Sequence, residues 1–179
     1  MKYASRIGRA LSVVVLMVGV GIVAPASIAH ADKPTRTVVV PESIVIPVGE
    51  ACSFPVALDV PERVSVVVTE FADGRIVTHD RAKLTLTNAD TGESLVHITS
   101  AMITEVPAGG GEIQVDISGQ LFMWFYPGDQ GPNGLVEYPG EAFSVNGHTR
   151  VTVDEETLVF TSFSIKGKTT DICAALATE

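Results

Sequence analysis

The stretch Glu112–Gly128, EIQVDISGQLFMWFYPG, decides the fold class of this chain. Apolar β-branched residues alternate with polar ones over residues 113–118, which is the period-two pattern of a half-buried β-strand. Six apolar or aromatic residues follow without interruption at Leu121–Tyr126, and Pro127-Gly128 ends the run. Because six residues are too few for a stable helix, the run is interpreted as a strand.

The same alternation recurs along the chain and predicts an all-β fold. Strand patterns cover residues 64–69, 84–87, 150–154 and 159–165. Turn signals separate such segments, and the strongest two-residue hairpin signal is Asn146-Gly147. Short strands with turns every 8–12 residues or so predict one immunoglobulin-like, Greek-key β-sandwich of roughly eight to ten strands. The other turns are expected at Asp73-Gly74, Asn88–Gly92, Ala108–Gly111 and Asp154–Glu156, and a helical pattern beyond the leader occurs only at Ile172–Ala177.

The N-terminus has the form of a secretory signal peptide. Three basic residues precede the apolar run Leu11–Val23, and Ala29-His30-Ala31 matches the site of a signal peptidase. We expect cleavage between Ala31 and Asp32, although Ala24-Pro25-Ala26 offers an earlier site and an uncleaved anchor is the alternative. Residues 1–31 are then the signal peptide, residues 32–179 form one secreted domain, and no membrane span is expected after cleavage.

The charge of the chain is strongly negative. Its formal net charge is −9, and three of its 12 basic residues, Lys2, Arg6 and Arg9, lie in the predicted signal peptide, whereas all 21 acidic residues follow it. Such a surface repels nucleic acids and anionic lipid headgroups. We therefore expect no nucleic-acid partner, while cationic partners remain possible.

The two cysteines predict a single disulfide. Cys52 and Cys173 are the only cysteines in the sequence, and the signal peptide directs them to an oxidising compartment. They lie near the two ends of the predicted domain, with no second thiol or histidine near either, so a metal site is the weaker interpretation. The bond would join the termini of the domain.

The aromatic run is the candidate ligand site. If Leu121–Tyr126 and Leu135–Tyr138 paired as a hairpin with Tyr126 opposite Leu135, Trp124 would face Glu137. A carboxylate is rarely buried without a partner, so this face would be the wetter one and could stack on a sugar or grip a partner. Trp124, Tyr126 and Glu137 are therefore the candidate ligand-binding residues. The alternative is that the run is core, since a one-residue slip in register reverses the two faces.

Other chemistry has little support in the sequence. His79, His97 and His148 lie on separate segments, and the oxygen-rich groups Asn88–Glu93 and Asp129, Asn133 and Glu137 lack the further ligands of a calcium site. Neither a nucleophile elbow, a zincin helix nor a phosphate-binding glycine loop occurs. We expect no metal, no cofactor and no enzymatic activity.

The chain resembles small secreted actinobacterial proteins of unknown function. The resemblance rests on the signal peptide, Cys52-Ser53-Phe54-Pro55, the turn Thr87–Gly92 and the segment Asp171–Leu176, and it spans most of the predicted domain. It implies a secreted, disulfide-linked β-protein and brings no activity, ligand or catalytic residue with it.

Together these patterns predict a non-enzymatic extracellular or cell-wall-associated binding module. The candidate partners are an extracellular protein or a cell-wall glycan. The alternatives are a structural or interaction protein without a small-molecule site and, third, a small secreted hydrolase.

Overall fold

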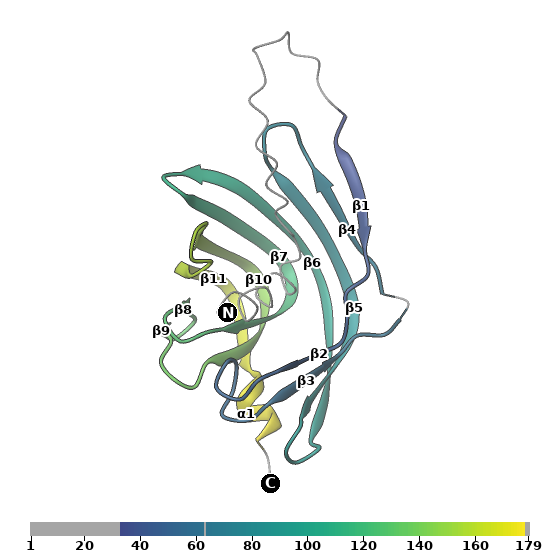
Figure 1. The fold of residues 1–179 in the computed structure, drawn as a ribbon, viewed down its shortest axis with the longest axis vertical. Coiled ribbons are helices and arrows are strands. Elements are labelled where there is room, and N and C mark those ends of the chain that lie inside the picture. Colours follow the sequence, from purple (N-terminus) through teal and green to yellow (C-terminus); the bar gives the residue numbers. More distant parts are fainter. Residues whose placement is uncertain (1–32, 63, 178–179) are drawn as a thin grey trace, which may run out of the picture.

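The computed structural model describes residues 33–62 and 64–177, and this part of the chain is almost entirely β-structure (Figure 1). The expected all-β fold is confirmed. The predicted signal peptide and its cleavage site lie outside the described residues. The elements are β1 (Thr35–Val39), β2 (Ile44–Ile46), β3 (Val56–Asp59), β4 (Val66–Glu70), β5 (Ile76–Asn88), β6 (Ser94–Gly109), β7 (Glu112–Phe125), β8 (Gln130–Gly131), β9 (Gly134–Leu135), β10 (Glu141–Asp154), β11 (Phe160–Asp171) and α1 (Ile172–Leu176).

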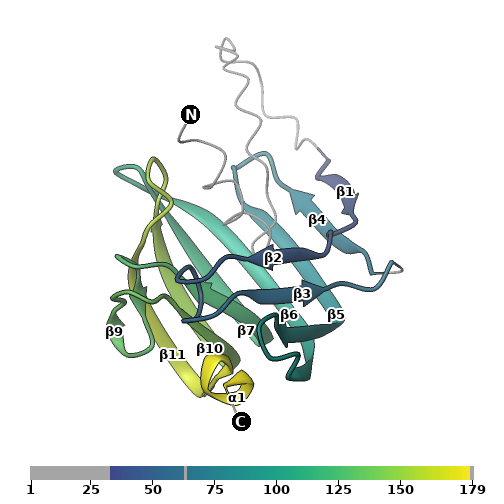
Figure 2. The same cartoon turned by 60° about the horizontal axis from the view of Figure 1, so that its bottom comes forward.

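Nine of the strands form one antiparallel sheet. Seven of them follow the order β1-β4-β5-β6-β7-β10-β11, while β3 also pairs with β5 and β2 pairs with β3. From β4 to β11 the sheet is a meander, and β1 lies beside β4. The outer edge of β5 is shared: β4 pairs with its first residues, from Ile76 to His79, and β3 pairs with its last, from Thr85 to Asn88. Figure 2 shows the β2–β3 pair and the β1–β4 pair separating from each other along this edge.

The central strands are longer than the sequence pattern predicted. β5, β6, β7 and β10 each contain 13 to 16 residues. The turns at Asp73-Gly74, Asn88–Gly92 and Ala108–Gly111 are confirmed, but the hairpin predicted at Asn146-Gly147 is wrong. β10 continues through these two residues, which pair with Gln120 and Gly119 of β7 on one side and with Lys168 and Gly167 of β11 on the other.

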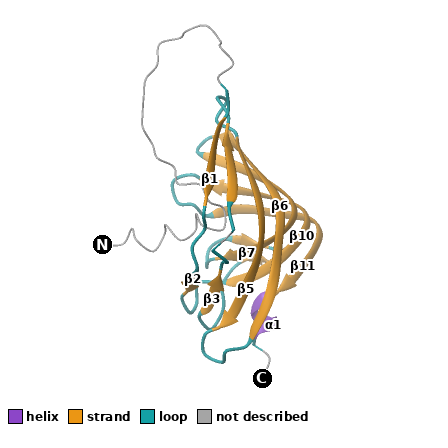
Figure 3. Cartoon of the chain, turned by 90° about the vertical axis from the view of Figure 1, so that its right-hand side faces the viewer, coloured by secondary structure: helices purple, strands orange, loops and turns teal. Residues whose placement is uncertain are grey.

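A row of glycines explains why Asn146-Gly147 lies within a strand and forms no hairpin turn. Gly119, Gly147 and Gly167 are direct neighbours on three adjacent strands. A Cβ at any of them would overlap a carbonyl oxygen of the neighbouring strand, and Gly119 and Gly147 have positive φ angles of 117° and 139°. Glycine inside a strand commonly marks a bend or a close approach of backbones. Gly147 therefore allows the sheet to curve, as Figure 3 shows, and does not form a turn.

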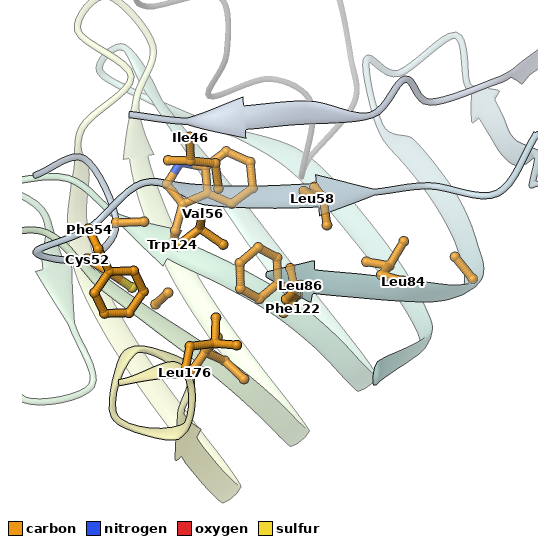
Figure 4. Close-up of a cluster of buried hydrophobic side chains, with 14 residues drawn as sticks. Ile46, Cys52, Phe54, Val56, Leu58, Leu84, Leu86, Phe122, Trp124 and Leu176 are labelled. Atoms are coloured by element: carbon orange, nitrogen blue, oxygen red, sulfur yellow. The ribbon is translucent and has the colours of Figure 1, made fainter. Parts of the chain in front are cut away.

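Two hydrophobic clusters pack on opposite faces of β7. Leu121, Met123 and Phe125 point into the cluster formed with β10 and β11. Phe122 and Trp124 point into the other, between the lower part of β5, the β2–β3 pair and α1 (Figure 4). Strands β6 and β7 remain paired only as far as Ser100 and Gln120, so beyond this point the two halves of the sheet diverge and enclose a core.

The predicted disulfide is confirmed and holds α1 against the β2–β3 pair. Cys52 bonds to Cys173 with 5.5 Å between their Cα atoms and a sequence separation of 121. The Asp171 carboxylate accepts a hydrogen bond from the backbone N–H of Ala174 and caps the helix. At its other end the buried Asn88 side chain donates to the Leu176 carbonyl at 3.1 Å, which ties the β5–β6 turn to the helix.

Candidate binding surface

The three predicted ligand-binding residues do not form one exposed face. Trp124 is only 5% exposed and packs 5.7 Å from the Phe122 ring, centroid to centroid, inside the core. Tyr126 is half-buried and Glu137 is exposed. The inference that the Trp124 face is the wetter one is wrong, since both faces of β7 are covered at this point.

The reason is that the assumed hairpin register does not occur. Trp124 pairs with Ala142 of β10, and the short β8–β9 pair joins Gln130 to Leu135 instead of Tyr126 to Leu135. The buried Asp129 carboxylate fixes this loop by accepting hydrogen bonds from the backbone N–H groups of Tyr126 at 2.7 Å and Phe160 at 3.0 Å. The Asp129 carboxylate therefore orders the backbone of this loop, and its hydrogen bonds explain its position without a calcium ion.

The outer face of the sheet is a broad surface built of regular structure. Side chains alternate between the two faces of a strand, and the register places residues of successive strands in rows. One face carries the buried row Thr78, Ile103, Ile117 and Thr149, so the intervening residues form the outer face.

Two rows of the outer face are rich in polar and basic groups. The central row crosses five strands and consists of Arg81, Ser100, Gln120, Asn146 and Lys168. The row beside it consists of Val67, His79, Met102, Ser118, His148 and Lys166. Since strands lie about 4.8 Å apart, the basic groups at the two ends of the central row are separated by about 19 Å of neutral hydrogen-bonding side chains.

Basic residues are concentrated on this face although the chain as a whole is acidic. The outer face carries Arg36, Arg81, Lys83, Arg150, Lys166 and Lys168, against the acidic Asp59, Glu112, Asp116 and Asp154. Glu112 and Asp154 lie at the hairpin end of the face and Asp59 at the opposite end. The middle of the outer face is therefore positive.

Asp116 is the acidic residue within this positive area, and Arg150 neutralises it. The Arg150 Nε atom donates to its carboxylate at 2.7 Å, Gln114 donates at 2.7 Å, and His148 Nε2 lies 3.7 Å away. Burial alone would raise the pKa of Asp116, but the hydrogen bonds from Arg150 and Gln114 and the charge of Arg150 hold it below its usual value. Among the residues that the structure describes, Arg81, Lys83, Lys166 and Lys168 form no ion pair, so their charges face solvent.

An exposed aliphatic stripe runs along β6 beside the basic side chains of β5. It consists of Val96, Ile98, Met102 and Val106, of which Ile98 is 56% exposed. Ile98 lies directly opposite Lys83, and Met102 lies opposite His79. Neither the central row nor the row beside it contains Phe, Tyr or Trp, so these two rows offer no ring on which a nucleic-acid base could stack.

The inner face holds ionisable groups away from this surface. Burial lowers the pKa of His97, whose ring packs 6.1 Å from that of Phe122, and raises the pKa of Glu105 to about 7. Glu105 is 9% exposed, and its Oε1 atom has no hydrogen-bond partner in the part of the chain that is described. Burial also raises the pKa of Asp80, and a hydrogen bond from Thr99 partly opposes this.

Neither a metal centre nor a membrane-spanning helix is found in the described part of the chain. Across residues 33–62 and 64–177, no group of three or more potential metal ligands comes together, and no helix is long and apolar enough to cross a membrane. The Asn88 side chain stabilises the turn after it, because its Oδ1 atom accepts hydrogen bonds from the backbone N–H groups of Asp90 and Thr91. Searches of known protein families, curated proteins and solved structures find no match to this chain.

Proposed function

We propose that this protein is a secreted, non-enzymatic binding module and that its outer face binds an acidic glycan of the cell surface. The observation that carries the proposal is the concentration of unpaired basic side chains on one face of an acidic protein. A surface of one sign attracts a polymer of the opposite sign over roughly a Debye length, about 8 Å at physiological salt.

The chemistry of the central row favours a glycan over other polyanions. Ser100, Gln120 and Asn146 present hydroxyl and amide groups, which both donate and accept hydrogen bonds as sugar hydroxyls do. Arg81 and Lys168 at its ends provide charges for carboxylates or phosphates. A nucleic acid would meet the same charges but would find no aromatic platform for its bases.

The proposal is tested by titrating the protein with polygalacturonate and with neutral dextran of similar length. We expect saturable binding to polygalacturonate alone. The logarithm of its association constant should fall linearly with the logarithm of salt concentration, because bound cations are released from the polymer. Equal affinity for dextran, or binding that is independent of salt, would contradict the proposal, and stronger binding to single-stranded DNA would assign the face to nucleic acid instead.

A pair of matched double variants locates the binding surface. Arg81→Gln with Lys168→Gln removes the two charged ends of the central row. Lys33→Gln with Arg75→Gln removes the same charge from elsewhere, since Lys33 precedes β1 and Arg75 stacks on Phe71 at the β4–β5 turn. The first pair should weaken polygalacturonate binding at least tenfold, and the second pair should change it less than twofold.

The exposed stripe on β6 supports a second candidate function, an interaction protein with a protein partner. Val96, Ile98 and Met102 would then provide the apolar centre of an interface. Ile98→Ser distinguishes the two functions, because it removes apolar surface and leaves every charge in place. It should leave glycan binding within twofold if the basic rows hold the polymer.

A further inference from the structure

A notch opens on the inner face of the sheet, where β3 and β4 separate along the edge of β5. Between the two pairing regions, the segment Asp80–Leu84 has neither β3 nor β4 beside it. The chain from Pro41 to Ile44 crosses over this notch. It covers part of a cavity of about 50 Å³ that is lined mainly by β5 and β6 and is partly open to solvent.

The wall of the cavity is mostly apolar, with polar groups gathered on one side. Thr78, Asp80 and Thr99 are neighbours on the inner faces of β5 and β6, and Glu42 stands exposed among the lining residues. The apolar lining consists of Pro41, Ile44, Leu58, Val60, Val66, Ala82, Leu84, Ile103, Leu121 and Phe122. The apolar run Leu121–Tyr126 therefore contributes to this cavity through Leu121 and Phe122.

The Asp80 carboxylate is held in a fixed orientation. The backbone N–H of Ala82 donates to Thr99 Oγ1 at 3.0 Å, and Thr99 Oγ1 in turn donates to Asp80 Oδ1 at 3.1 Å. Within the described residues, Oδ2 of Asp80 has no hydrogen-bond partner and no basic side chain forms an ion pair with the carboxylate. Oδ1 of Asp80 thus holds the carboxylate in place, and Oδ2 remains available to accept a hydrogen bond from a ligand.

Thr78 provides an independent sign that the cavity is built for a ligand. Its side chain is only 3% exposed, it lines the cavity, and its Oγ1 atom has no partner among the described residues. Buried hydroxyls are nearly always hydrogen-bonded, so an unpaired one two residues from a partly buried carboxylate requires a partner that the chain does not supply.

We propose that this cavity binds a primary alkylammonium group, with Asp80 Oδ2 and Thr78 Oγ1 accepting its N–H bonds and the apolar wall packing on its carbon chain. An ammonium has three donors and no acceptor, which matches a site that offers acceptors to a cation. Because a water needs roughly 10–15 Å³ measured in this way, the cavity has room for a few waters or for one ammonium on a short chain. A cation would also compensate the cost of keeping Asp80 ionised within the protein.

The direct test is calorimetric titration of the oxidised protein with n-propylammonium, with n-propanol as the neutral comparison. We expect saturable binding of the amine and none of the alcohol. Binding should strengthen as pH rises through the pKa of Asp80, which burial raises, and Glu42 is the other ionisable group in the lining. Absence of amine binding by the folded protein, or equal binding of the alcohol, would overturn the proposal and leave a water-filled cavity.

Three variants distinguish a loss of amine recognition from a general effect on the protein. Asp80→Asn retains an acceptor for the Thr99 hydroxyl but removes the charge, and should weaken amine binding at least tenfold. Thr78→Val removes the unpaired hydroxyl at nearly constant volume, and should weaken binding severalfold without unfolding the protein. Asp59→Asn makes the same change of charge at an exposed site outside the lining and should have no effect. Unchanged amine affinity in both Asp80→Asn and Thr78→Val would contradict the assignment.

Discussion

At the scale of single residues, Trp124 shows how an apparent ligand platform becomes core. From the sequence alone, Trp124 could lie on an exposed or a buried face, depending on the register of its strand. In the structure Trp124 pairs with Ala142, and its side chain is buried. We expect the only tryptophan of the chain to emit at short wavelength and to be quenched weakly by acrylamide. A red-shifted and readily quenched emission from the folded protein would contradict this placement.

Substitution of Trp124 gives a second check on the same residue. Trp124→Ala should lower the free energy of unfolding by about 3–5 kcal/mol, because it opens a cavity beside Phe122. Trp124→Phe should cost much less, since it keeps a ring and removes a buried Nε1 atom that has no partner in the described structure. Urea unfolding followed by circular dichroism measures both, and equal costs for the two variants would argue against a packed core here.

Glu105 predicts how stability depends on pH. Its pKa is raised from an ordinary 4.5 to about 7, so between these values the folded state binds more protons than the unfolded state. Stability should therefore fall as pH rises from 4.5 to 7, by up to about 3 kcal/mol from this residue. Glu105→Gln should remove that part of the slope, whereas Glu93→Gln in the exposed β5–β6 turn should leave it. A wild-type slope retained in Glu105→Gln would refute this explanation.

At the scale of elements, the glycine row is expected to set the bend of the sheet. Gly119→Ala should destabilise the protein by more than about 2 kcal/mol, because its Cβ would meet the backbone of Ser100 as well as an unfavourable φ angle. Gly110 also has a positive φ but nothing within 4 Å, so Gly110→Ala should cost only about 1–2 kcal/mol. Denaturant midpoints compare the two, and similar losses would mean that contact across strands is unimportant.

The elements also show what local sequence can and cannot predict. Alternation and turn residues located most strands, several hairpins and the helix at Ile172–Leu176, because these features depend on neighbours along the chain. Asn146-Gly147 misled because the same dipeptide suits a tight turn and a close approach of strands. Only Gly119 and Gly167, distant in sequence, distinguish the two cases.

At the scale of the whole molecule, the disulfide joins the loop between β2 and β3 to the C-terminal helix, far apart in the sequence. Removing a crosslink that spans 121 residues should cost on the order of 4–5 kcal/mol through the added entropy of the unfolded chain. We expect the double variant Cys52→Ser with Cys173→Ser to unfold at a markedly lower urea concentration. Reduction of the native protein should give the same midpoint as the double variant, and an unchanged midpoint in either would contradict a stabilising role.

The cysteine pairing followed from the sequence because two cysteines allow one intramolecular bond, but the outer face did not follow. Its central row joins residues from Arg81 to Lys168, which become neighbours only through the register of five strands. The cavity at Asp80 is equally non-local, since it depends on where β3 and β4 separate. The negative net charge of the chain gives no sign of a basic surface, because it sums over all faces of the protein. The fold places most basic side chains on one of those faces.

Glycan binding by the outer face can be mapped residue by residue from backbone amide shifts, recorded while the isotope-labelled protein is titrated with short oligogalacturonates. We expect shifts concentrated in β5, β6, β7, β10 and β11 around the row from Arg81 to Lys168, with little change near Asp129 or α1. Shifts confined to another surface, or no shifts at saturating oligosaccharide, would contradict the assignment of the outer face as a glycan-binding surface.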